Sequence, residues 1–305
     1  METAGCVFLP AAGDRNGSSV FFPGTSGFYW SATPTGAGTA YNVYFSSSYL
    51  FPTASSNRSV GSSVRLVKAT SDAAPAAGAK AAKDATAEDL GKVIGADGYI
   101  YDNVEAATAA GTTASAIIAY VGTAGSVDES SSTYKGLAIA LTDANSGSAC
   151  QWYTNFKTCV SQTNVIATAI TYTNGIASTN TLTSDGHTHA AATAASSYGT
   201  DRPSGVSAWF LPSMGQWNLI VQGLATKQAG STISTDLTTF SNSTYTASNL
   251  NSVITDAGGT GFQSSYYWSS TEYSFSYAWD VDFGNGYADS NHKTTNSYVR
   301  AVFAF

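Results

Sequence analysis

Two stretches of the chain alternate apolar and polar residues in the same order. In residues 29–45 and again in residues 267–283, Tyr, Trp, Phe and Val recur with Ser, Thr, Asn or Asp between them. A period of two is the signature of β-strands, because successive side chains point to opposite faces. The pattern therefore predicts strands whose Trp, Phe and Val side chains face a core, while the intervening Asn, Asp and Tyr side chains face outward.

These stretches belong to an internal repeat. The matched blocks are Tyr29–Thr33 with Tyr267–Thr271, Ala40–Phe45 with Ala278–Phe283, and Val64–Val67 with Val299–Val302. The first two blocks have the same spacing in both copies, and the gap before the third differs by three residues, which suits a loop. Each copy is predicted to supply three short strands.

The segment between the copies contains further predicted elements. Apolar runs predict strands over 91–101, 114–121 and 135–141, with a tight Asp-Gly turn in the first of them. Helices are predicted over 151–160, over 187–197 after a Ser184-Asp185 start signal, and over 213–225. In the last helix Ser213 is the expected N-cap, and Trp217, Ile220, Val221 and Leu224 share one face. Residues 226–262, rich in Ser, Thr, Asn and Gly, are predicted to be a long loop.

The two copies differ in what precedes them. About 180 residues of predicted strands and helices lead up to the second copy, as in a whole domain, but only 28 residues precede the first. We therefore expect 1–68 to be the back half of a domain, 69–88 to be a linker, and 89–305 to be a complete domain. The first segment is expected to complete the second domain, to pair with another chain, or to stay unfolded.

Composition and charge exclude several classes of partner. Only 11% of the residues are charged, against roughly 25% in ordinary soluble domains, so the polar surface is built from hydroxyls, amides and glycine. The net charge is -7 and no basic cluster is present, which argues against binding to nucleic acid or to an anionic membrane surface. No apolar run reaches membrane-spanning length, so membrane insertion is not expected. The first six residues have neither a basic nor an apolar stretch, so no signal peptide is expected in this chain.

Three cysteines are too few for a disulfide scaffold. Cys150 and Cys159 either form a bridge across a bent segment or remain two buried thiols.

The repeat blocks resemble a known family. Tyr267–Glu272, the block Ala278–Phe283, the Gly/Asn turn after it, the single Lys293 and the closing Val299-Arg300 are similar to the C-terminal region of C-type-lectin-fold proteins that are diversified by retroelements. Phe8–Gly13 and Trp209–Trp217 resemble the major paralogous domain family of gut Bacteroidetes and their phages. The resemblance covers about 89–305 as a whole domain and 6–68 as a fragment.

The resemblance implies an α+β fold of the C-type lectin kind. Such a fold has short twisted antiparallel strands, two main helices, long irregular loops and a ligand surface near the C-terminus, here within a variable region of about 264–305. In such families, the adenines of a template sequence are randomised when it is copied. Codons of the Asn type therefore change into codons for a limited set of residues, here called the permitted set. It includes Asn, Asp, Ser, Tyr, His, Gly and Phe but excludes Trp, Glu, Lys, Gln and Met.

Residues of that permitted set fill the predicted outward and loop positions of 272–298. The expected ligand-binding residues are Tyr273, Ser274, Phe275, Ser276, Tyr277, Asp280, Asp282, Asn285, Tyr287, Asp289, Asn291, His292, Asn296 and Tyr298. Trp268, Glu272, Trp279 and Lys293 lie outside the set, at positions where the family keeps its scaffold. Polar loops favour Asn, Ser, Asp and Gly in any protein, but the Tyr and Phe residues favour a binding surface, because aromatic side chains give large contact area at low entropy cost.

Other chemistry is weakly represented. Trp268, Trp279, Phe283 and Val299 are expected to pack, and Glu272 and Arg300 either form a buried pair or remain two solvated charges. His187 and His189 would share one face of a strand and begin a metal site, with Asp185 as the one carboxylate nearby, but a helix-start or loop role is more expected. Asp280 and Asp282 on one strand face would meet calcium, but a metal-free protein is more expected. No nucleophile elbow, phosphate loop or Cys-x-x-Cys motif is present. The formylglycine-generating enzymes of the same fold use paired cysteines late in the chain, and none occurs after Cys159.

The sequence thus favours a non-enzymatic binder of receptor or adhesin type, without cofactor or metal. Its expected partner is a protein or glycan on a cell surface, and its expected location is extracellular, on a phage virion or a bacterial surface. The alternative is a structural repeat protein of the cell envelope without diversified binding.

Overall fold

The computed structural model describes residues 9–64, 79–228 and 245–305, and the chain divides into two compact units, 1–69 and 70–305. Every strand pair within the named sheets of the described residues is antiparallel. The structure is therefore of the α+β class, with several small antiparallel sheets.

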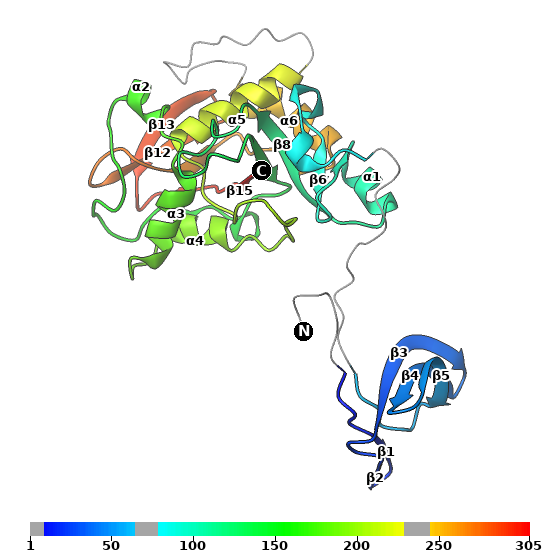
Figure 1. Cartoon of the computed structure of the whole chain (residues 1–305). Helices are drawn as coiled ribbons and strands as arrows, with labels where there is room; N and C mark the ends of the chain where they lie inside the picture. Colours follow the sequence, from blue (N-terminus) through cyan, green and yellow to red (C-terminus); the bar gives the residue numbers. More distant parts are fainter. Residues whose placement is uncertain (1–8, 65–78, 229–244) are drawn as a thin grey trace. The chain divides into compact units, whose positions relative to one another are not determined.

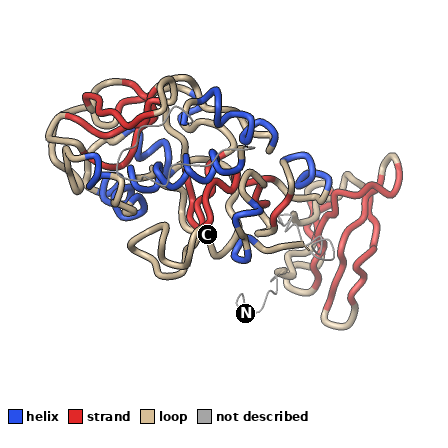
Figure 2. The backbone as a smooth tube through the Cα atoms, turned by 90° about the horizontal axis from the view of Figure 1, so that it is seen from above, coloured by secondary structure: helices blue, strands red, loops and turns tan. Residues whose placement is uncertain are grey.

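The first unit consists of a short hairpin and a three-stranded sheet. The hairpin strands are β1 (Asp14–Asn16) and β2 (Ser19–Phe21), and the sheet strands are β3 (Ser26–Gly36), β4 (Thr39–Ser46) and β5 (Leu50–Asn57). The three long strands lie side by side in chain order (Figure 2). Among its described aromatic and aliphatic side chains only Tyr29 is buried, while Tyr49 and Phe51 are exposed. This unit therefore has almost no core of its own.

The second unit is built around a five-stranded sheet in the order β15-β9-β8-β6-β7. Its strands are β6 (Val93–Gly95), β7 (Ile100–Tyr101), β8 (Ala114–Val121), β9 (Gly136–Ala140) and β15 (Val302–Ala304). The strands predicted over 114–121 and 135–141 are confirmed. A second sheet comprises β11 (Tyr266–Glu272), β12 (Tyr277–Asp282) and β13 (Tyr287–His292), and β10 (Cys150–Gln151) pairs with β14 (Asn296–Ser297).

Helices cover both faces of the central sheet (Figure 1). They are α1 (Val104–Ala109), α2 (Ile166–Ala169), α3 (Gly175–Ser184), α4 (Ala190–Ser196), α5 (Met214–Lys227) and α6 (Ala247–Asp256). Ile117 of β8 packs in one core cluster with α5 and α6, and its neighbour Ile118 packs in the other cluster with α4. α5 lies directly on β8, because Gly223 has no Cβ to collide with the carbonyl oxygen of Ala119.

The prediction for α5 is confirmed in detail. Ser213 caps the helix and forms a capping box with Gln216. Trp217, Ile220, Val221 and Leu224 are all fully buried.

Other expectations about helices were wrong. Residues 151–160 form a strand end and a loop, Ser184 ends α3 and does not start a helix, and α6 lies within the predicted long loop, of which 229–244 fall outside the described residues. The part of the chain that the structure describes thus contains three helices of ten or more residues, where two main helices were expected.

The predicted linker also differs in its second half. Residues 65–78 lie outside the described part, but residues 79–88 pack on the second unit, where Ala82 and Ala85 are buried. Short 3-10 turns over Ala82–Asp84 and Ala87–Asp89 and an ion pair between Lys80 and Asp89 at 2.5 Å hold this segment.

The two copies of the repeat adopt the same strand pairing. Tyr29 pairs with Val43 in the first copy, and Tyr267 pairs with Val281 in the second. In each copy the residue after that Tyr donates its backbone N–H to a distant carbonyl, Trp30 to Ser63 and Trp268 to Tyr298. The strands predicted at the first two blocks of each copy are confirmed as β3, β4, β11 and β12. The third strand of each sheet lies before the third block, as β5 and β13; residues 65–67 lie outside the described part, and only Val302 of 299–302 belongs to a strand.

Candidate ligand-binding surface

The sheet β11-β12-β13 is anchored by buried aromatic side chains. Trp268, Trp279 and Phe283 are between 0% and 6% exposed, and the Trp217 indole of α5 donates a hydrogen bond to the carbonyl oxygen of Trp268 at 3.1 Å. Phe283 also stacks on Phe262, with ring centroids 4.2 Å apart. The packing role predicted for the Trp and Phe side chains is confirmed, and the sheet is a fixed frame.

A buried ion pair closes one end of this frame. The Lys293 ammonium lies 2.6 Å from the Glu272 carboxylate, both side chains are fully buried, and the ammonium also donates to the carbonyl oxygens of Lys157 and Phe275. Burial raises the pKa of Glu272, while Lys293 and the backbone N–H groups of Cys159 and Val160 oppose that rise. The pair therefore connects β11, the turn after it, the end of β13 and the loop after β10.

The expected pairing of Glu272 with Arg300 is wrong. Arg300 is fully buried and binds Asp143 at 2.7 Å, and it donates to the carbonyl oxygens of Ala140 and Thr260. Arg300 therefore joins the C-terminal segment to the central sheet, and Lys293 is the partner of Glu272.

Most of the expected ligand-binding residues lie at or near the surface. Phe275, Asn285, His292 and Asn296 are exposed, and Tyr273, Ser274, Ser276, Tyr277, Tyr287, Asp289, Asn291 and Tyr298 are half-buried. Two of the tyrosines are partly held by the core, because Tyr298 stacks on the buried Tyr267 and Tyr273 packs edge-on against Trp279. All twelve residues thus combine a fixed backbone with a partly accessible side chain.

Asp280 and Asp282 do not face outward, which corrects the expectation for both. They lie on β12, the central strand of its sheet, and are 0% and 3% exposed. Asp280 accepts a hydrogen bond from the Asn291 amide, and Asp282 accepts from the amide and backbone of Asn285 and so fixes the turn into β13. Both carboxylates therefore accept hydrogen bonds within the sheet and its turn.

Burial changes the acidity of Asp280. Removal from water raises the pKa of its carboxyl to about 7, repulsion from Asp289 and Asp282 adds to the rise, and the Asn291 hydrogen bond opposes it. One oxygen, Oδ1, has no hydrogen-bond partner in the described structure.

A row of four aromatic rings crosses one end of the sheet, at the end of β11, the start of β12 and the end of β13. We define this aromatic row as Phe156, His292, Tyr277 and Tyr273. Successive ring centroids are 5.9, 4.1 and 6.1 Å apart. Phe275, which is 59% exposed, lies in the turn between Tyr273 and Tyr277. Such a row offers apolar contact area with polar groups beside it.

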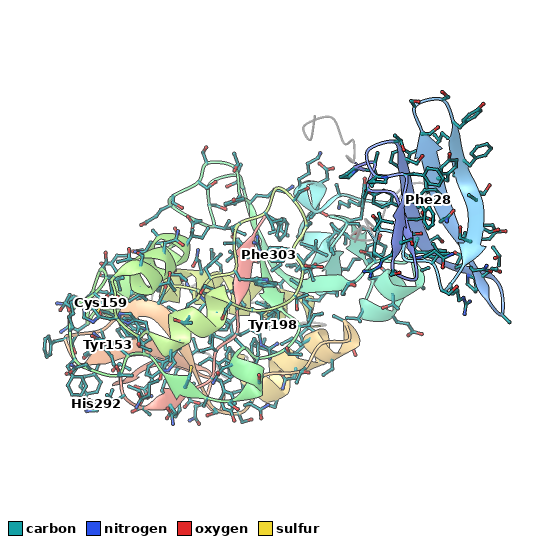
Figure 3. The ribbon with its side chains drawn as sticks, turned by 90° about the horizontal axis from the view of Figure 1, so that it is seen from below. Phe28, Tyr153, Cys159, Tyr198, His292 and Phe303 are labelled. Carbon is teal, nitrogen blue, oxygen red and sulfur yellow. The ribbon has the colours of Figure 1, made fainter. Side chains whose placement is uncertain are left out.

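Phe156 was missed from the sequence. It is 39% exposed and comes from the loop 152–163, for which a helix was predicted. No signal in the local sequence placed this loop beside β13, because its contacts there, Phe156 with His292 and Tyr153 with Lys293, join residues more than 100 positions apart. Figure 3 shows the same loop's Tyr153 and Cys159 at the end of the unit where His292 lies.

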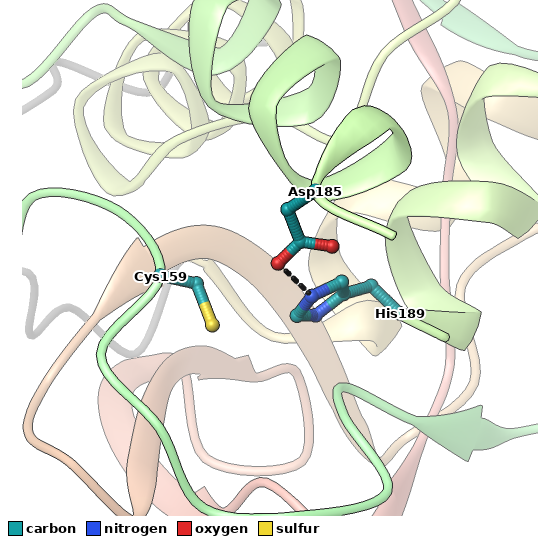
Figure 4. Close-up of side chains that lie close together, drawn as sticks. All are labelled: Cys159, Asp185 and His189. Atoms are coloured by element: carbon teal, nitrogen blue, oxygen red, sulfur yellow. Dashed lines mark hydrogen bonds and ion pairs between the residues drawn. The ribbon is translucent and has the colours of Figure 1, made fainter. Parts of the chain in front are cut away.

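The cysteine and histidine expectations have separate outcomes. Cys150 and Cys159 are both free and half-buried, so they form no bridge. His187 and His189 lie in the connection between α3 and α4 and not on a strand, and only His189 joins a group of potential metal ligands, with Cys159 and Asp185 (Figure 4).

The similarity of this chain to known proteins is weak. No family model matches the chain, and no curated protein matches it. A solved structure described as a fimbrial protein from Bacteroides ovatus ATCC 8483 is similar with a TM-score of 0.45 and 12% identity, covering 92% of this chain. The chain spans 64% of the length of that protein. Within the described residues, no helix has the length and apolar character needed to cross a membrane.

Proposed function

We propose that this chain is a non-enzymatic ligand-binding protein of receptor or adhesin type, with its binding surface on β11-β12-β13 and the adjoining turns. The fold we assign to the second unit is of the C-type lectin kind, and the variable surface is diversified by a retroelement. The partner is a protein or glycan on a cell surface, met outside the cell by a phage virion or a bacterial surface structure.

The observation that carries this proposal is the division of side chains along 268–298. Residues outside the permitted codon set, namely Trp268, Glu272, Trp279 and Lys293, are buried in the frame. The partly accessible positions hold Tyr, Phe, His, Asn, Asp and Ser, and also Gly284, Ala288, Thr294 and Thr295. Asn285 and Asn291 also bond to the buried Asp282 and Asp280. Exchange of the other members of the second group leaves the frame intact, so binding specificity can change while the backbone stays fixed.

The binding role is tested with a matched pair of double variants. Phe275→Ser with His292→Ser removes two exposed side chains of the surface, and Tyr49→Ser with Phe51→Ser removes two exposed aromatic side chains of the first unit. The labelled proteins are titrated against a glycan array and against a panel of intact bacterial cells.

We expect the first variant to lose binding by about tenfold or more, which is about 1.4 kcal/mol. The control should bind as the parent does, and both should keep the parental melting temperature. Equal binding by all three proteins, or loss only in the control, would place the ligand elsewhere.

Diversification is tested separately by sequencing sibling copies of the gene. Substitutions confined to the permitted set at the accessible positions, with a reverse transcriptase gene and a template repeat nearby, support it. Substitutions spread evenly over the chain favour the alternative, a structural repeat protein of the cell envelope. The observation that fits this alternative is the same pairing of the first two strands in both repeat copies.

A further inference from the structure

Three potential metal ligands lie close together where the loop that carries Phe156 meets the connection between α3 and α4. The Cys159 thiol, the Asp185 carboxylate and a ring nitrogen of His189 each offer one atom, and these three atoms lie within 4.8 Å of one another. Figure 4 shows that they come from separate segments: the loop 152–163, the end of α3 and the start of α4. The binding surface described above does not use any of them.

The connection between α3 and α4 holds two of the ligands in place. Asp185 accepts a hydrogen bond from the backbone N–H of His187, and Gly186 between them has a φ of 78°, a left-handed conformation that glycine adopts without strain. This turn brings the Asp185 carboxylate to 3.0 Å from Nε2 of His189. Two neighbouring ligand atoms on a tetrahedral ion with bonds of about 2.0–2.2 Å lie about 3.3–3.6 Å apart, so a shift of a few tenths of an ångström brings this pair to the spacing of two ligands.

The imidazole of His189 is fixed and kept neutral. The ring is fully buried, stacks on Tyr153 with centroids 4.3 Å apart, and meets the edge of Trp152 at 5.5 Å. Burial lowers the pKa of His189 despite the neighbouring Asp185. The Asp185 carboxylate accepts from Nε2 of the ring, which places the proton of the neutral imidazole on Nε2 in the metal-free protein. Nδ1 is buried and has no hydrogen-bond partner in the described structure.

Cys159 is held on the other side by the frame. Its backbone N–H donates to the buried carboxylate of Glu272 at 3.0 Å, and its side chain is half-buried. The charged groups around the cluster are Glu272, Lys293 and the exposed Lys157, whose ammonium lies 4.0 Å from Asp185. A thiolate and a carboxylate together balance the charge of one divalent cation.

We propose that Cys159, Asp185 and His189 form a binding site for a divalent transition metal of the zinc class, with water as the fourth ligand. Sulfur, nitrogen and oxygen donors in one cluster favour Zn²⁺ over Ca²⁺ or Mg²⁺, which prefer oxygen alone. On binding, the Cys159 thiol loses its proton to solvent. The imidazole proton, which faces Asp185 on Nε2 in the metal-free protein, moves to Nδ1 so that Nε2 can bind the metal. The bound ion joins the loop that carries Phe156 to α3 and α4.

The same three residues in a hydrolase would form a nucleophile, a base and an orienting acid. That role requires a thiol with a lowered pKa, whereas burial raises the pKa of Cys159 to about 11. A metal does not need the lowered pKa, because a coordinated thiol is deprotonated by the ion itself. The convergence of three donor atoms within 4.8 Å of one another favours the metal site, and reactivity of the thiol is an outcome of the test.

The test uses the full chain after chelator treatment, titrated with Zn²⁺ and with Co²⁺ as a spectroscopic probe. We expect one ion per chain, release of one proton from the thiol, and a thiolate-to-Co²⁺ charge-transfer absorption. Cys159→Ser should abolish that absorption and weaken Zn²⁺ binding by about tenfold or more. Cys150→Ser replaces the other half-buried free thiol and is the matched control, which should behave as the parent does.

A measurement on the unmodified protein guards against a variant that fails to fold. Zn²⁺ should protect Cys159 from alkylation by iodoacetamide, read by peptide mass mapping, and should leave Cys150 unprotected. The proposal is overturned by the absence of one-to-one binding, by a charge-transfer band that survives in Cys159→Ser, or by rapid alkylation of Cys159 that Zn²⁺ does not slow. None of these readouts depends on the cell-surface ligand, so this proposal and the proposed function fail separately.

Discussion

At the scale of single residues, Asp280 is where simple alternation breaks down. The strand pattern predicts an outward side chain, yet the carboxyl is fully buried beside Asn291. Alternation identifies the two faces of a strand, but it does not tell whether the polar face is later covered. A short polar side chain with a local partner is compatible with both outcomes, so this position could not be predicted from the sequence.

The raised pKa of Asp280 has a consequence for stability. In the unfolded chain the carboxyl titrates near 3.8, and in the folded chain near about 7, so the folded state holds the proton more tightly between these values. The stability contribution is therefore full below about pH 4 and is lost as the pH rises to about 7. At about 1.4 kcal/mol per pKa unit, the loss is at most about 4 kcal/mol.

Asp280→Asn should remove this dependence, because the amide oxygen can still accept from Asn291 and carries no charge. We expect the variant and the parent to unfold at similar denaturant concentrations near about pH 4, and the variant to be more stable near about pH 8. Asp256→Asn, which changes an exposed carboxylate of α6, is the control and should leave the pH dependence unchanged. A parent and an Asp280→Asn variant with parallel stability profiles would refute the raised pKa.

At the scale of elements, local signals predicted what local contacts determine. The capping residue Ser213 and the apolar stripe of α5 were sufficient to predict that helix, because both act within one or two turns. Residues 151–160 were predicted wrongly for the opposite reason. Their backbone groups bond to distant partners, such as Tyr153 to Lys293 and Cys159 to Glu272, and these tertiary bonds override the helical pattern.

The Glu272–Lys293 pair should matter to stability far more than surface pairs do. Lys293→Met leaves the Glu272 carboxylate buried without its cation, and we expect the free energy of unfolding to fall by about 3–5 kcal/mol. Chemical denaturation measures this loss.

Two further variants complete that experiment. Adding Glu272→Gln to Lys293→Met should restore much of the loss, because no uncompensated charge remains. Lys83→Met breaks an exposed pair with Asp84 and should cost less than about 1 kcal/mol. Similar losses for Lys293→Met and Lys83→Met would contradict this prediction, because the buried Glu272–Lys293 pair would then contribute no more to stability than an exposed pair.

At the scale of the whole molecule, the internal repeat was the most reliable signal in the sequence. It predicted two copies of the same strand arrangement, and Tyr29 and Tyr267 occupy the same register. What the repeat could not reveal is the cluster of Cys159, Asp185 and His189, because Cys159 reaches the other two only through the tertiary path of its loop.

The two copies differ in their cores, which predicts different behaviour in isolation. A fragment of residues 79–305 contains both core clusters and should unfold cooperatively. Residues 9–64 bury Tyr29 but leave Tyr49, Leu50 and Phe51 exposed, so a three-stranded sheet of this kind should show no cooperative transition. Differential scanning calorimetry of the two fragments checks both expectations, and a sharp transition in the short fragment would contradict the second.

The central claim is that a rigid buried frame displays exchangeable side chains, and a substitution scan over 264–305 tests it most directly. Each variant is displayed on cells and scored for folding by resistance to protease. We predict that Phe275, Tyr277, His292 and Asn296 accept nearly every residue of the permitted set, while Trp268, Glu272, Trp279 and Lys293 accept almost none. Equal tolerance at both groups, or loss of folding on changing the accessible group, would contradict it.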